Sequence, residues 1–163
     1  MINSSFIQEN FPKGKLSVVL GRPAAGKTSM AVSLAQALVS DGNHPIFFSM
    51  EMSKEMLVTR FAAHMGSEEP VVVWENTLVN DTPSLKVSDI REAINNVSVD
   101  FIIIDYLQLM TCEGCCSREE ELGQIKSELK AIASERNIPI VLLSQMSRAQ
   151  EEKLNQELVI ITE

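Results

Sequence analysis

Short runs rich in apolar residues alternate along the chain with longer segments in which apolar residues recur every three or four positions. The runs occupy residues 15–20, 45–49, 101–104 and 139–144, of which residues 101–104 are apolar throughout, with weaker runs at residues 77–80 and 158–162. Residues 67–74 fit neither pattern, and Pro70 favours a loop or a sheet edge there. A run without polar interruption is typical of a strand that helices cover on both faces. Strands that alternate with helices are joined by right-handed crossovers, so the pattern predicts an α/β fold with a mostly parallel sheet flanked by helices.

Four segments between these runs show the periodicity of amphipathic helices. Their apolar faces are, in chain order, Ala31, Leu34, Ala35 and Leu38; Val58, Phe61, Ala62 and Met65; Ile90, Ala93, Ile94 and Val97; and Leu122, Ile125, Leu129, Ile132 and Ala133. Ser53, Ser88 and Ser117 precede the last three segments, and a serine in this position caps a helix by accepting a backbone N–H. Residues 117–120 also fit a capping box. We therefore expect these serines to begin the three helices, and residues 40–43 to end the first.

The size and composition are those of a globular domain. The 163 residues lie close to the usual length of one domain, and the apolar share of 45% and charged share of 22% exclude disorder and a collagen-like chain. The chain has 14 lysines and arginines and 22 acidic residues, so its net charge is −8. A field of this sign repels phosphate backbones, so the chain is not a freestanding nucleic-acid binder. Any contact with DNA must come from a local surface.

The amino terminus and the cysteines indicate a cytoplasmic protein. Residues 1–6 lack the basic and apolar regions of a secretory signal, and no apolar run approaches the roughly 18 residues of a membrane helix. Cys112, Cys115 and Cys116 contain one C-x-x-C pair without a second, whereas a structural zinc site needs four ligands. We interpret the cluster as an oxidisable loop in a reducing cytoplasm, with zinc binding as the alternative, and we expect no membrane contact.

A phosphate-binding pattern, G-x-x-x-x-G-K-[ST], lies between the first predicted strand and the first predicted helix. Its residues are Gly21, Arg22, Pro23, Ala24, Ala25, Gly26, Lys27 and Thr28, with Ser29 continuing into the helix. The glycines allow a tight turn whose N–H groups converge on phosphates, and the positive end of the helix follows. Lys27 would then contact the β- and γ-phosphates, and the Thr28 hydroxyl would bind magnesium. The alternative is a glycine-rich turn that binds nothing.

Three polar residues follow predicted strands, at the edge of the sheet where α/β proteins bind ligands. Asp105 ends an apolar run, from where a carboxylate can reach a phosphate loop and hold magnesium. Glu51 can orient or deprotonate a water molecule, and the neutral amide of Gln145 can hydrogen-bond a γ-phosphate. The alternatives are a turn cap at Asp105, a helix-entry acid at Glu51 and a polar strand end at Gln145. Spacing alone does not decide between these interpretations.

Together these residues resemble the RecA-like ATPase domain of DnaB-type replicative helicases. Five blocks match the motifs of that family in order, at residues 21–28, 48–53, 81–83, 104–110 and 143–148. The resemblance extends from about Gly14 to Arg148. It implies a RecA-like P-loop fold that takes ATP and Mg²⁺ as its ligands. The implied roles are phosphate binding by Lys27, magnesium binding by Thr28 and Asp105, base catalysis by Glu51 and γ-phosphate sensing by Gln145.

Residues 1–163 match only part of such helicases. The family's amino-terminal domain and its carboxyl-terminal strands have no counterpart here, nor do the DNA-contacting loop and the arginine that reaches a neighbour's nucleotide. An arginine supplied in trans accelerates related enzymes by ~10³–10⁵. We therefore expect a single RecA-like domain that binds ATP and hydrolyses it weakly, without unwinding DNA on its own. Its expected partners are single-stranded DNA through oligomeric assembly, and either a second copy or a helicase or loader.

Two other functions fit the same motifs. One is a non-catalytic, helicase-like interaction module that binds nucleotide and docks on a full-length helicase or loader. The other is a small-molecule kinase, which would need an arginine-rich lid that the sequence does not show. No Asn-Lys-x-Asp motif occurs, so we expect ATP rather than GTP as the nucleotide.

Overall fold

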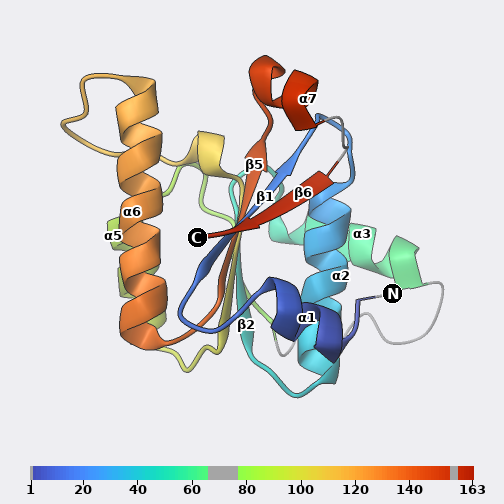
Figure 1. Ribbon diagram of the computed structural model, residues 1–163. Coiled ribbons are helices and arrows are strands. Elements are labelled where there is room, and N and C mark those ends of the chain that lie inside the picture. The colour runs from blue at the N-terminus through green and yellow to red at the C-terminus, as the bar shows by residue number, and fades with distance from the viewer. Residues whose placement is uncertain (1, 66–76, 155–157) are drawn as a thin grey trace.

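The computed structural model describes residues 2–65, 77–154 and 158–163, in which six strands form one sheet (Figure 1). The strands are β1 (Leu16–Gly21), β2 (Pro45–Ser49), β3 (Leu78–Asn80), β4 (Phe101–Asp105), β5 (Ile140–Gln145) and β6 (Leu158–Thr162). Their order across the sheet is β3-β2-β4-β5-β1-β6, and all neighbours pair in parallel except β6, which is antiparallel to β1. The predicted strands are confirmed to within one residue at each end, and so is the mostly parallel α/β sheet.

Helices cover both faces of this sheet. They are α1 (Ser4–Asn10), α2 (Lys27–Ser40), α3 (Lys54–Met65), α5 (Val87–Asn95), the 3₁₀ helix η1 (Leu107–Leu109), α6 (Arg118–Arg136) and α7 (Arg148–Leu154). In Figure 1, α5 and α6 lie on one side of the sheet, whereas α1, α2 and α3 lie on the other. Among the described helices, none is long and apolar enough to cross a membrane.

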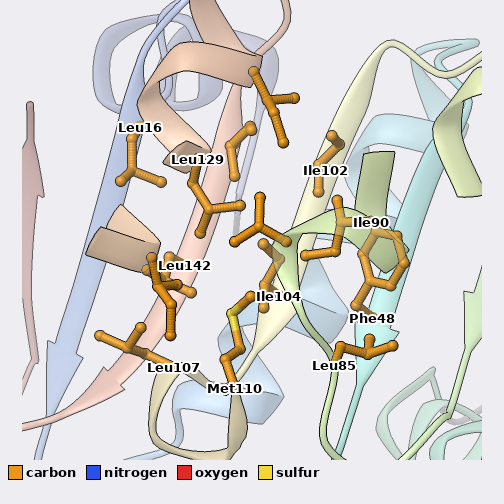
Figure 2. Packing of buried hydrophobic residues seen from close by; sticks show 14 of the residues in the cluster. Leu16, Phe48, Leu85, Ile90, Ile102, Ile104, Leu107, Met110, Leu129 and Leu142 are labelled. Atoms are coloured by element: carbon orange, nitrogen blue, oxygen red, sulfur yellow. The ribbon is translucent and has the colours of Figure 1, made fainter. Parts of the chain in front are cut away.

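The central strand β4 shows why its apolar run is continuous. Ile102 and Ile104 belong to the buried cluster under α5 and α6, together with Ile90 and Leu129 (Figure 2). Ile103, which lies between them in the strand, packs on the opposite face with residues of α2. All five side chains are fully buried. Because successive residues of a strand point to opposite faces and both faces are covered, every position in the run must be apolar.

Two of the three predicted helix caps are confirmed. Ser117 Oγ accepts the N–H of Glu120 at 3.2 Å, and Ser53 Oγ accepts the N–H of Met56 at 3.4 Å. The capping box is displaced by one residue, because the Glu120 carboxylate accepts from the N–H of Cys116, at 3.0 Å, instead of from Ser117. The serines therefore mark the starts of α3 and α6 as the sequence predicts.

The prediction for α5 is wrong at both ends. The Asp89 carboxylate accepts the backbone N–H of Lys86 at 2.8 Å, so the helix begins at Val87 and Ser88 lies inside its first turn. An acid in the first turn supplies the cap here, in place of a serine before it. The helix also ends two residues before Val97, which is 38% exposed and does not extend the apolar face.

Three short elements, α1, η1 and α7, are not predicted by periodicity. Each has seven residues or fewer, which is too short for a helical pattern to repeat. Helix α1 begins at a cap in which Asn3 Oδ1 accepts the N–H of Phe6 at 2.9 Å. Phe11, which follows the helix, packs edge-on against Phe101 of β4, with 6.2 Å between ring centroids. Residues 67–74, where the sequence favours a loop or an edge, lie outside the described residues.

The two-sided burial of the sheet predicts a large difference between two leucines in strands. Leu142 of β5 is fully buried in the cluster under α6, whereas Leu78 of the edge strand β3 is 42% exposed. We expect Leu142→Ala to lower the free energy of unfolding by about 2–5 kcal/mol. The matched change Leu78→Ala should cost less than about 1 kcal/mol. Urea unfolding followed by circular dichroism measures both, and equal losses would contradict this assignment of the core.

Candidate active site

The carboxyl ends of four parallel strands meet at one edge of the sheet. Gly21 at the end of β1 lies opposite Gln145 at the end of β5. Ser49 at the end of β2 lies opposite Asp105 at the end of β4. Since β4 and β5 are neighbours, the segments that leave these strands lie side by side. The edge therefore gathers the phosphate loop, Glu51, Asp105 and Gln145, as the sequence predicts.

The loop between β1 and α2 is a tight turn that leads directly into the helix. Ala25 N donates to Arg22 O at 3.1 Å, and Met30 N donates to Gly26 O at 2.9 Å in the first turn of α2. Gly26 has a φ of 85°, a left-handed conformation that glycine adopts without steric cost. The first N–H groups of α2, which have no partner within a helix, therefore face the same edge as the strand ends.

Lys27 lies at the start of α2 with its ammonium group folded onto the loop. Its Nζ donates to Gly21 O at 2.9 Å and to Arg22 O at 2.8 Å. Partial burial lowers the pKa of Lys27, while the charges of Asp105 and Glu51 act in the opposite direction. The ammonium group thus lies between backbone carbonyls and two carboxylates, where a phosphate could accept its hydrogen bonds.

Thr28 and Asp105 join the phosphate loop to β4. Thr28 Oγ1 donates to Asp105 Oδ2 at 2.9 Å, and Asp105 is only 2% exposed. The pKa of Asp105 is raised from its ordinary 3.8 to about 6, chiefly by desolvation and also by the charge of Glu51, whereas the Thr28 hydrogen bond and Lys27 act to lower it. A hydroxyl and a carboxylate are oxygen ligands of the kind that Mg²⁺ prefers. The pair can therefore hold a magnesium ion at the edge of the sheet.

Glu51 is carried by a turn that the backbone of β2 and β4 fixes. Met50 N donates to Asp105 O at 2.9 Å. Ser49 Oγ donates to Met52 O at 2.7 Å and accepts from Met52 N at 3.2 Å, which closes the turn around Glu51. The Glu51 side chain is exposed at the wall of the cleft. A carboxylate so placed can accept a proton from a water molecule in the cleft.

A cleft of about 820 Å³ lies between these groups. Of the predicted residues, those that line it are Pro23, Ala24, Gly26, Lys27, Thr28, Ser29, Glu51, Asp105 and Gln145. Gly21, Arg22 and Ala25 do not line it. Gly21 and Arg22 instead accept hydrogen bonds from Lys27 through their carbonyl groups, so they shape the loop through the backbone.

Five lining residues escape the sequence prediction: Met52, Met56, Thr59, Arg60 and Tyr106. Met56, Thr59 and Arg60 have i, i+3, i+4 spacing, so they share one face of α3. That spacing indicates a shared helix face, but the face carries both polar and apolar side chains and resembles an ordinary solvent-exposed surface. Only the position of α3 beside the strand ends identifies it as a wall of the cleft.

The Arg22 side chain turns away from the cleft toward α7. Its Nε lies 3.9 Å from Glu151 Oε2, which places the phosphate loop and α7 in electrostatic contact. Both side chains are partly exposed, so the pair contributes little to stability. The Arg22 side chain therefore takes no part in lining the cleft.

The cysteine cluster lies in the loop between η1 and α6. All three thiols are free, and Cys115 Sγ donates to Gln124 Oε1 at 3.3 Å. The hydrogen bond with Cys112 raises the pKa of Cys115 to about 11, which disfavours the reactive thiolate. Among the described residues, no group of three or more His, Cys, Asp or Glu side chains could hold a metal ion.

The buried carboxyl of Asp105 makes stability depend on pH. Because its pKa is higher in the folded chain than in the unfolded chain, its ionisation destabilises the fold as pH rises through about 6. The shift corresponds to about 3 kcal/mol at most. We expect Asp105→Asn, which keeps an acceptor for Thr28, to stabilise the chain above pH 6 and to lose this advantage as pH falls toward 4.

Urea unfolding at pH 5 and pH 8 in the presence of a chelator measures this effect. Glu92→Gln is the control, since Glu92 is exposed and its substitution should change stability little at either pH. A gain for Asp105→Asn that is equal at both pH values would contradict the electrostatic explanation.

Comparison with known proteins identifies the family. Residues 6–69 and 68–159 match the model of the DnaB-like helicase C terminal domain. The replicative DNA helicase DnaB of Geobacillus stearothermophilus is 32% identical over 171 residues, which cover 88% of this chain and 38% of that protein. The chain thus spans well under half the length of this relative.

Two solved structures share the fold. One is a DnaB-like replicative helicase, described with its interactions with primase, with a TM-score of 0.67, 24% identity and coverage of 87% of this chain and 40% of that one. The other is the RadB recombinase, with a TM-score of 0.60, 22% identity and coverage of 85% and 66%. The fold is that of RecA-like ATPase domains. This chain belongs to the DnaB-like helicase C-terminal domain family.

Proposed function

We propose that the chain binds ATP with magnesium and hydrolyses it, as the ATPase domain of a DnaB-like replicative helicase. The observation that carries this proposal is the 2.9 Å hydrogen bond between Thr28 of the phosphate loop and the buried Asp105 of β4. It sets a hydroxyl and a carboxylate at the end of the cleft that Lys27, Glu51 and Gln145 also line. The alternatives that spacing left open, a turn cap or a helix-entry acid, do not require these five side chains to share one cleft.

The phosphate loop would bind the triphosphate. N–H groups at the start of α2 converge on the cleft, and Lys27 can exchange its two carbonyl acceptors for phosphate oxygens. Thr28 and Asp105 would hold magnesium, since their oxygens fit its preference and two protein ligands leave room for phosphates and water. When bound, the ion would neutralise negative charge on the phosphates.

Glu51 and Gln145 would act on the γ-phosphate end. Glu51 is a carboxylate at the wall of the cleft, and it would orient a water molecule and accept its proton. Gln145 also lines the cleft, next to the first glycine of the loop, and its amide would hydrogen-bond the γ-phosphate without adding charge.

We propose further that turnover by the isolated chain is slow. In the described part of the chain, the cationic side chains that line the cleft are Lys27 and Arg60. Related phosphate-loop enzymes gain roughly 10³–10⁵ in rate from an arginine that a neighbour supplies. Assembly with a full-length helicase would supply such a group. With a net charge of −8, any contact with single-stranded DNA would depend on a local surface of that assembly.

Two substitutions test the proposal. Lys27→Ala removes the ammonium group at the phosphates and should weaken ATP binding roughly tenfold or more, because charged hydrogen bonds are the strong ones. Glu51→Gln removes the base and should leave ATP binding nearly unchanged while lowering kcat roughly 10²-fold or more. Calorimetry with ATP and magnesium, together with a phosphate-release assay, measures both.

Glu55→Gln is the matched control for Glu51→Gln. Glu55 lies one turn further along, in α3, and is absent from the cleft lining, so its substitution should change neither binding nor turnover. Unaltered ATP affinity in Lys27→Ala would overturn the proposal. ATP binding without any turnover would instead favour the non-catalytic interaction module.

A further inference from the structure

Gln108 of η1 is joined to the main chain of Gln145 by a pair of hydrogen bonds. Gln108 Nε2 donates to Gln145 O at 3.2 Å, and Gln145 N donates to Gln108 Oε1 at 3.2 Å. The same Nε2 also donates to Ser144 Oγ at 3.0 Å. A planar amide that uses both its donor and its acceptor on one residue fixes the backbone of that residue in place and in orientation.

This amide takes the place of a missing strand neighbour. Strands β4 and β5 pair only as far as Ile104 opposite Leu142, three residues before Gln145. On its other side the end of β5 is held by β1, where Gly21 lies opposite Gln145 and Gly21 O accepts from Met146 N at 3.2 Å. That bond to β1 is made by Met146, whereas the N–H of Gln145 is bound by Gln108, and its carbonyl accepts from Gln108 and, at 3.4 Å, from Ser144 Oγ.

The turn that carries Gln108 is itself held firmly. Leu107 and Met110, on either side of it, are buried in the cluster under α6 (Figure 2). Arg118, at the start of α6, donates to Gln108 O at 2.7 Å and to Met110 O at 3.1 Å. Two buried side chains and one arginine therefore fix the main chain of this turn, so only the side-chain rotations of Gln108 are lost when its amide binds Gln145.

We infer that Gln108 is a positioning residue, which holds Gln145 at the angle from which its side chain meets the γ-phosphate of ATP. The inference rests on the proposed function, because it concerns the same cleft. Gln108 itself does not line the cleft, so any effect on nucleotide must pass through Gln145. The consequence is specific: loss of Gln108 should impair recognition of the γ-phosphate and leave binding of the rest of the nucleotide intact.

The test compares ATP and ADP affinities in the full chain carrying Gln108→Ala, Gln145→Ala or both. Gln145→Ala should reduce the preference for ATP over ADP roughly tenfold, the loss expected for a hydrogen bond to a charged group. Gln108→Ala should reduce it several-fold and leave ADP affinity unchanged. The double variant should match Gln145→Ala alone, since residues that act as one unit do not contribute additively.

Two further variants distinguish a positioning role of Gln108 from a general loss of folding. Gln108→Met keeps the length of the side chain without adding charge and loses both hydrogen bonds to Gln145, so it should also reduce the ATP preference. Gln124→Ala removes an exposed amide of α6 that bonds Glu128, and it should behave as wild type. Thermal unfolding of every variant shows whether an affected variant is folded.

The outcomes are distinct. Equal losses of ATP and ADP affinity in Gln108→Ala, or losses that add to those of Gln145→Ala, would show a merely structural role and overturn the inference. A normal ATP preference in Gln108→Ala, with a reduced one in Gln145→Ala, would overturn it while the proposed function stands. No nucleotide binding by the wild type would overturn both.

Discussion

The hydrogen bond between Thr28 and Asp105 is the contact on which the arrangement of the site depends. Asp105 ends β4, whereas Thr28 follows β1, and β5 lies between these two strands. The bond therefore spans a strand and links the phosphate loop to the centre of the sheet. Its acceptor is a buried carboxylate, whose ionisation costs free energy unless a donor or a cation lies beside it. Thr28 and Lys27 supply both, which explains why the loop closes onto this strand.

Much of the fold follows from the sequence because the sheet is covered on both faces. Neither face of a strand such as β4 meets solvent, so its side chains form a continuous apolar run. The ends of such a run therefore mark the ends of the strand. Helix starts are less certain, because several side chains compete to cap them. Asp89 displaces Ser88 as the cap of α5, and nothing in the local pattern ranks an acid in the first turn above a serine before it.

The candidate site is predictable where its residues follow strands and not where they lie on a helix. Asp105 and Gln145 end buried strands and Glu51 lies two residues after one, and parallel strands bring their carboxyl ends together. Arg60 lies well inside α3, and its approach to the cleft depends on the angle at which that helix leaves β2, which no spacing encodes. The roles of these side chains toward nucleotide stay predictions.

Charge explains why a neutral amide, Gln145, suits the end of β5. Asp105 and Glu51 already lie close enough for one to raise the pKa of the other, and a triphosphate would bring further negative charge to the same edge. A third carboxylate at Gln145 would repel the ligand, and a third cation would compete with Lys27 for the carboxylates. A neutral amide avoids both costs but supplies only a directional hydrogen bond, whose strength falls steeply with misalignment. The γ-phosphate sensor that we propose at Gln145 would need a fixed backbone, and the amide of Gln108 would provide it without adding charge.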